Sequence, residues 1–431
     1  MRGEQDLVRT LRTAAGQVER IDLAEGVAAR RRGRRTRQRV RVALAAAAVV
    51  AIAGGTTVAL SGEGRRAQPA VTATPSAPRF TSAAEVWPNA VAKMPTRNSE
   101  GMSIHPVTAL SATEVLMLAS PNGASWERAM RLEVYDTARK TARVLGEIPP
   151  VKKISVPVPQ ALPGPAVIAV DSRYIAWSAR ADNRPRMSFW IMPRAGGAAR
   201  KVVEAAMVAD AVALSGDSLV WSLAKGGVYR VPLTGGTPAR LPGTDGLHLT
   251  AWPWAAGYEG RALVKNQNRV VNLETGQSFD VSVPKGARML RCVSQWCVGE
   301  LKNRVVVQRV DGSERKTLPS ALRPYGPSEP LGDGDRFALV SVHDPDKNKP
   351  GVPLAVMYDL ATGMMTGLGE RIPGTEGRGV TRGVHWAAPS TTLFWDQDLR
   401  IRQQCEKGRC IPRASGGGKE YTLLNLAAVT R

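Results

Sequence analysis

The four cysteines of the chain form two pairs with the same spacing, Cys292 and Cys297 in CVSQWC and Cys405 and Cys410 in CEKGRC. Four thiolates can hold a zinc ion in a tetrahedral site, but zinc-binding pairs usually have two residues between the cysteines. An oxidising compartment, argued for below, favours a disulfide within each pair. The spacing therefore predicts two local disulfides, 292–297 and 405–410, with one zinc site as the alternative. Each short ring should stabilise the fold by about 2 kcal/mol or less.

Residue patterns typical of hydrolytic enzymes are absent from the sequence. No His-Glu-x-x-His spacing and no Gly-x-Ser-x-Gly elbow occurs. HDPDKNKPG at 343–351 has oxygen side chains at alternate positions, but Lys349 stands where a calcium loop needs glycine, which favours a solvated turn. We therefore predict no catalytic residue, no metal site, no cofactor and no enzymatic activity. The histidines, each expected to be an ordinary loop or strand residue, are His105, His248, His343 and His385.

The elements that carry these residues should be short strands. From Ala84 onward, short apolar runs alternate with turn residues, and the chain has 42 glycines and 30 prolines. Residues 167–203 and 211–242 share one pattern, with Trp177 and Trp221 at matching places before a Gly-Gly turn. Weaker copies of the last hairpin occur at 132–149, 269–284, 305–319, 354–369 and 410–424. Repeats of this length with four strands each predict an all-β propeller of six or seven blades, with Trp177, Trp221 and Trp395 in the core between blades.

The two clearest repeats, with SRYIAWS before FWIMPRAGG, resemble the WD40-like repeat of TolB-type β-propellers. The resemblance covers most of residues 100–420 and implies a propeller fold. The usual family turn Ser-Pro-Asp-Gly is replaced here by VDSR and SGDS.

The segment before the propeller has the pattern of a membrane anchor. Val42–Leu60 is an uncharged, mostly apolar run of 19 residues, enough to cross the roughly 30 Å core of a bilayer. The arginines that precede it predict a cytoplasmic N-terminus and an extracytoplasmic C-terminal part. The 41 residues ahead of the run favour an uncleaved anchor over a cleaved signal peptide, and the arginines argue against a buried core helix. The membrane-flanking arginines are Arg34, Arg35, Arg37, Arg39 and Arg41.

This pattern divides the chain into four parts. Residues 1–41 form a cytoplasmic segment, 42–60 the transmembrane helix in contact with lipid, 61–83 a Pro/Ser/Thr/Ala-rich linker and 84–431 the propeller. The layout also resembles that of membrane-anchored proteins of high-GC Gram-positive bacteria, often encoded beside sigma factors of the extracytoplasmic-function type.

The cytoplasmic segment contains an amphipathic helix. Over residues 4–21, apolar residues that include Leu7, Leu11 and Val18 share one helical face. Because 40 residues cannot form a core of their own, this face should bind either a cytoplasmic regulator or the membrane surface. The segment has no histidine or cysteine, so it lacks the zinc motif common in anti-sigma domains.

The charge of the chain is strongly basic, with 59 Lys plus Arg against 37 Asp plus Glu. A basic surface favours anionic partners, but no cluster of basic and aromatic residues indicates nucleic-acid binding. We expect a single-pass membrane protein that displays a non-enzymatic propeller outside the cytoplasm. The propeller would bind an unknown ligand or protein and report to a cytoplasmic regulator such as a sigma factor. The alternatives are an envelope enzyme of the lyase or hydrolase type and a purely structural envelope scaffold.

Overall fold

The computed structural model describes residues 80–431 except for short internal stretches and the last two residues. The excluded residues are 122–129, 150–164, 181–185, 207, 259–264, 326–329, 333–334, 344–350, 372–379, 383–390, 397–399, 407–408, 416–417 and 430–431. The predicted cytoplasmic segment, span and most of the linker lie outside the described residues. Among the described residues, no helix is both long and apolar enough to cross a membrane.

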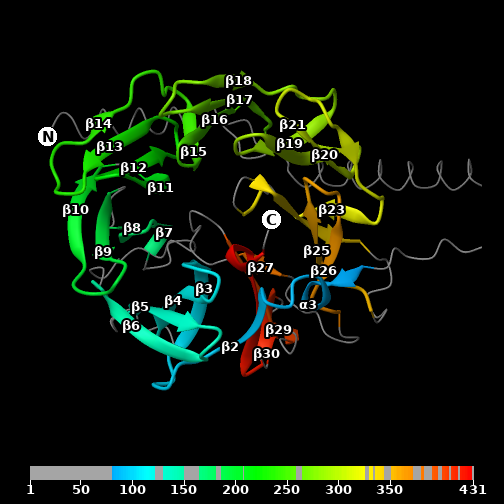
Figure 1. The fold of residues 1–431 in the computed structure, drawn as a ribbon, viewed down its shortest axis with the longest axis horizontal. Coiled ribbons are helices and arrows are strands. Elements are labelled where there is room, and N and C mark those ends of the chain that lie inside the picture. Colours follow the sequence, from blue (N-terminus) through cyan, green and yellow to red (C-terminus); the bar gives the residue numbers. More distant parts are fainter. Residues whose placement is uncertain are drawn as a thin grey trace, which may run out of the picture. The chain divides into compact units, whose positions relative to one another are not determined.

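The described residues form seven antiparallel sheets of four strands, one of which has an additional fifth strand (Figure 1). Blade 1 consists of β3 (Ser103–Ala109), β4 (Glu114–Ser120), β5 (Met130–Asp136) and β6 (Thr141–Ile148). Blade 2 consists of β7 (Pro165–Val170), β8 (Tyr174–Arg180), β9 (Met187–Pro193) and β10 (Arg200–Ala205). Blade 3 consists of β11 (Ala209–Ser215), β12 (Ser218–Leu223), β13 (Val228–Pro232) and β14 (Ala239–Arg240).

The next two blades repeat this order. Blade 4 consists of β15 (Leu247–Ala251), β16 (Trp254–Tyr258), β17 (Gln267–Asn272) and β18 (Ser278–Asp280). Blade 5 consists of β19 (Ala287–Cys292), β20 (Trp296–Leu301), β21 (Arg304–Arg309) and β22 (Lys316–Thr317). In each of the first five blades, consecutive strands are hydrogen-bonded neighbours, as in a simple meander.

The last two blades also use the N-terminal part of the described chain. Blade 6 consists of β23 (Leu322–Pro324), β24 (Phe337–Val342), β25 (Ala355–Asp359) and β26 (Met365–Leu368), with β1 (Thr81–Ser82) paired in parallel to β26. Blade 7 consists of β27 (Thr381–Arg382), β28 (Thr392–Trp395), β31 (Glu420–Asn425) and β2 (Val91–Pro95). The short helix α3 (Ala83–Val86) connects β1 toward β2, so ordered pairing begins three residues ahead of Ala84.

Buried side chains join each blade to the next and close the ring. Separate apolar clusters lie between blades 1 and 2, 2 and 3, 3 and 4, 4 and 5, 5 and 6, and 6 and 7. Two further apolar clusters join blade 7 to blade 1 and so close the ring. In one, Val115 packs against Phe394 and Leu423, and in the other, Met94 of β2 packs against Ile104 and Met117. The fold is therefore a seven-bladed β-propeller. Of the two blade numbers that the sequence allowed, six and seven, the structure has seven.

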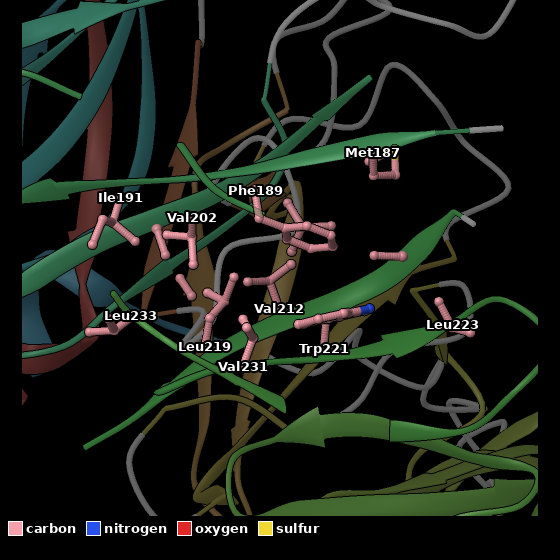
Figure 2. Packing of buried hydrophobic residues seen from close by; sticks show 14 residues of the cluster. Met187, Phe189, Ile191, Val202, Val212, Leu219, Trp221, Leu223, Val231 and Leu233 are labelled. Carbon is pink, nitrogen blue, oxygen red and sulfur yellow. The ribbon is translucent and has the colours of Figure 1, made fainter. Parts of the chain in front are cut away.

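The tryptophans of the sequence repeats occupy the interfaces between blades, as predicted. Trp177 packs toward blade 1, Trp221 toward blade 2 and Trp395 toward blade 6, and each is almost fully buried. Figure 2 shows Trp221 among the side chains of blades 2 and 3, where its ring centroid lies 4.6 Å from that of Phe189. At these three interfaces one bulky residue fills the wedge between neighbouring sheets, and its recurrence in blades 2 and 3 produces the sequence repeat.

Polar contacts also hold the closure of the ring. Thr108 of blade 1 and Thr391 beside blade 7 share a buried hydroxyl hydrogen bond of 2.8 Å. The Asn425 side-chain amide donates to the backbone oxygens of Ser111 and Ala112, at 2.8 and 2.9 Å. Blade 7 is thus bound to blade 1 through groups distant in sequence.

One hairpin stands apart from the seven sheets. Strands β29 (Arg400–Glu406) and β30 (Arg409–Ser415) pair only with each other among the described strands, and they are inserted between the second and third strands of blade 7. Sequence CIPRASGGGKEYTLL, predicted as one degenerate blade hairpin, is therefore divided between this insertion and β31.

Candidate functional site

The first strand of each blade lies on the inner side of the ring (Figure 1). The strand order implies that these inner strands all begin at the same end of the ring. A meander of four antiparallel strands returns the chain to the end where it started, so the next blade begins there too. The third strand of each blade starts at this end for the same reason. Residues at the starts of β11, β15, β17 and β19 therefore gather at one end of the ring, which we call the entry end.

Asp210 and His248 come together at the entry end across the interface of blades 3 and 4. Each is the second residue of its inner strand, β11 or β15. The His248 Nδ1 atom lies 2.5 Å from Asp210 Oδ2, and the Ser222 hydroxyl donates to Asp210 Oδ1 at 2.5 Å. Ser222 Oγ in turn accepts from the Leu249 backbone N–H at 3.0 Å, which fixes β15 onto blade 3.

A bulge places Asp210 in this position. The register of β11 with β12 shifts between Ala209 and Ala211, so Asp210 has no direct partner on β12. Such an extra residue turns its side chain away from the regular alternation of the strand. The Asp210 carboxylate can therefore reach both the buried Ser222 of its own blade and His248 of the next.

The network continues from blade 4 into blade 5. The His248 ring packs edge-on against Tyr258, with 5.2 Å between the ring centroids. The Arg291 guanidinium lies over the Tyr258 ring, 4.9 Å from its centroid. The Gln267 side chain donates to the Tyr258 hydroxyl at 3.2 Å and accepts from the Cys292 N–H at 2.5 Å. A continuous set of polar and aromatic contacts thus spans three blades.

The chemistry of this network depends on which group donates and which group accepts in each hydrogen bond. Because a carboxylate only accepts, His248 donates to Asp210 from Nδ1, and Nε2 is the ring nitrogen that this hydrogen bond does not use. His248 and Asp210 are partly exposed, at 21% and 31% of their side chains, whereas Ser222 is fully buried. Ser222 donates to Asp210 rather than to His248, so it is not arranged as a nucleophile activated by histidine.

Sequence reasoning missed this pair, since His248 was predicted to be an ordinary residue. One signal was available. Asp210 and His248 are 38 residues apart, close to one repeat, which places them at the same level of consecutive blades. Comparison with blade 2 also singles out this site. Blade 2 has the same Trp-Ser pair as blade 3, but Ala166 stands at the bulge position that Asp210 occupies in blade 3. Within the described residues, the buried Ser178 hydroxyl accordingly has no hydrogen-bond partner, unlike that of Ser222.

The first predicted disulfide is confirmed. Cys292 and Cys297 are bonded and fully buried, and they face each other directly across the β19–β20 hairpin. Cys405 and Cys410 have the same directly opposed backbone register in the β29–β30 hairpin. The second disulfide stays a prediction, now with a backbone register that matches the first.

Several other predicted features lie outside the described residues. These are the arginines at 34, 35, 37, 39 and 41, the apolar face with Leu7, Leu11 and Val18, His385, and most of the 343–351 turn. His105 lies on inner strand β3, where burial lowers its pKa and keeps the ring neutral near pH 7. Among the described residues, no group of three or more His, Cys, Asp or Glu side chains is arranged to hold a metal ion. Gly235 and Gly236 adopt φ values of 99° and 126°, which supports their predicted role as turn residues.

No protein-family model matches the sequence, and neither does any curated protein. Among solved structures, the chain is similar to the β-propeller domain of the Trilobed protease from Pyrococcus furiosus, with 10% identity over 68% of this chain and 87% of that one, and a TM-score of 0.39. It is also similar to BamB from Moraxella catarrhalis, with 11% identity over 78% and 98% and a TM-score of 0.36. TolB from Acinetobacter baumannii aligns with 13% identity over 69% and 76% and a TM-score of 0.31. The propeller assignment rests on the chain's own sheet topology.

Proposed function

We propose that the protein is a single-pass membrane protein that displays a non-enzymatic, ligand-binding β-propeller outside the cytoplasm. The observation that carries the proposal is the buried disulfide Cys292–Cys297 within the propeller. Structural disulfides persist in oxidising compartments and are rare in the cytosol. The arginines ahead of the apolar run at 42–60 independently favour the same orientation.

The arrangement of the entry end supports binding as the activity. Ser222 and His248 each bind one oxygen of Asp210, and the partly exposed His248 ring keeps a second nitrogen, Nε2, with which it can contact a ligand. The rigid inner strands hold it in place, as binding sites on regular elements require.

Topology is the first test. In intact spheroplasts, external protease should degrade the propeller and leave an N-terminal tag protected, because residues 1–41 are proposed to lie inside. The measurement is a blot for tags at both termini, with a cytoplasmic protein as the control for lysis. Protection of both tags would contradict the orientation, and release of an intact propeller fragment into the medium would indicate a cleaved signal peptide.

Reporting to a cytoplasmic regulator is the second part of the proposal, and the apolar face at residues 4–21 supports it. Replacing Leu11 and Val18 by aspartate should remove a specific partner, since burying each charge in an apolar groove costs several kcal/mol. The measurement compares the proteins that copurify with the full chain and with the double variant. Exchange of Arg12 and Arg20 for lysine, which keeps charge and the apolar face, serves as control. If the full chain retains only anionic lipid, signalling to a regulator is excluded.

A further inference from the structure

A second group of charged residues at the entry end surrounds the start of β19. Lys285 and Arg288 lie on either side of Ala287, the first residue of β19. Lys302 follows Leu301, which is the direct cross-strand partner of Ala287. Lys265 precedes Asn266, whose side-chain amide donates to the Ala287 backbone oxygen at 3.0 Å. We call Lys265, Lys285, Arg288 and Lys302 the β19 basic cluster.

Lys265 and Asn266, which directly precede β17, are fixed beside β19 by side-chain hydrogen bonds. Asn266 uses its amide twice, donating to Ala287 O and accepting from the Leu290 N–H, each at 3.0 Å. The buried Arg291 donates from Nη1 to the Lys265 backbone oxygen at 2.5 Å. Tyr258 covers the Arg291 guanidinium, and this ties the two residues to the network of Asp210 and His248. The backbone that carries Lys265 is therefore fixed beside β19, while the lysine side chains extend into solvent.

The positive charges of the cluster are poorly compensated. Lys265, Lys285 and Lys302 are exposed, and their ammonium groups form no hydrogen bond or ion pair with another described residue. Arg288 is 68% exposed and has one distant partner, Glu300, at 3.7 Å. Within the described part of the chain, these four cations have one carboxylate partner, Glu300. Such an excess of positive charge attracts anions, and an ammonium or guanidinium hydrogen-bonds phosphate oxygens well.

We propose that the β19 basic cluster binds an extracytoplasmic polymer of repeating phosphate groups. This inference rests on the proposed binding function and names the class of its ligand. The charges of the cluster come from one strand (Arg288), two turns (Lys285 and Lys302) and the bend before β17 (Lys265). A polymer suits this arrangement because its repeating phosphates can contact charges from adjacent blades together. An anionic lipid surface is less favoured, since none of the four large exposed apolar side chains of the described residues, Val144, Val208, Phe279 and Met364, belongs to the cluster.

The experiment uses the full chain in detergent, with inorganic polyphosphate as the probe. Lysine acetylation followed by mass spectrometry reports each lysine separately, so binding to the arginines at 30–41 does not obscure the result. Polyphosphate should slow the acetylation of Lys265, Lys285 and Lys302 by about fivefold or more, as expected for direct phosphate contacts. Lys201 and Lys316, exposed on outer strands β10 and β22, should change by less than about twofold.

Matched variants complete the test. Lys265→Glu with Lys302→Glu should abolish protection of Lys285, whereas Lys201→Glu with Lys316→Glu, which changes the net charge equally, should preserve it. Equal protection of all exposed lysines would overturn the site in favour of bulk charge. Protection by phosphatidylglycerol vesicles without protection by polyphosphate would overturn the polymer and indicate lipid headgroups. Because the assay uses purified protein, its failure is distinguishable from a failure of the proposed topology.

Discussion

Replacing Trp221 by alanine is expected to lower the free energy of unfolding by about 3–5 kcal/mol. The indole is 1% exposed and fills the wedge between blades 2 and 3, where it packs against Phe189 and Tyr229 with centroid distances of 4.6 and 5.9 Å. Alanine would leave a cavity that two rigid sheets cannot close. Unfolding in denaturant, followed by tryptophan fluorescence and circular dichroism, measures the loss.

The matched control is Phe279→Ala on the outer strand β18. This aromatic ring is 37% exposed, so its removal should cost about 1 kcal/mol or less. Similar losses for the two variants would show that Trp221 does not hold the blades together in the way that its burial indicates.

Replacing Met94 by aspartate should open the ring. Met94 lies on β2, the strand that completes blade 7, and is fully buried against Ile104, Met117 and Tyr135 of blade 1. A carboxylate at this place has no cation to pair with among those side chains, so burying it costs several kcal/mol. The loss should be larger at pH 8 than at pH 5, because the buried acid is protonated and neutral at the lower pH.

Thermal unfolding at the two pH values measures this effect, and limited proteolysis locates it. Cleavage should appear between Phe80 and Ser103, where the chain passes through β1, α3 and β2. Val144→Asp on the outer strand β6 is the control, because Val144 is 53% exposed and a charge there stays in water. A Met94 variant as stable as this control would show that β2 is dispensable for closure.

The sequence allowed the architecture of the propeller to be predicted because one physical pattern recurs in it. Trp177 and Trp221 mark the same position in consecutive sheets, and the Gly-Gly turns after them need positive φ. Blade 7 could not be recognised in this way. Its strands come from both ends of the described chain, and the β29–β30 insertion separates β28 from β31.

The candidate site was harder to predict, since it depends on contacts between blades. The local spacing of Cys292 and Cys297 was enough to predict their bond, because a hairpin brings close neighbours together. Asp210 and His248 have no local pattern, and they meet only because the bulge in β11 turns the carboxylate toward the next blade. The β19 basic cluster likewise joins the residues before β17 of blade 4 to blade 5 through Asn266.

The way the chain enters the ring has a mechanical consequence. Tension on the chain ahead of Thr81 reaches the two-residue pairing of β1 with β26 before it reaches β2. Release of β1 frees only Thr81 and Ser82, because Ala83 is buried between blades 6 and 7 and Trp87 packs edge-on against Phe337, with 5.7 Å between the ring centroids. A pull on this end is therefore expected to break the two-residue β1–β26 pairing first and then to meet the buried contacts of α3, before it reaches the five paired residues of β2 that complete blade 7.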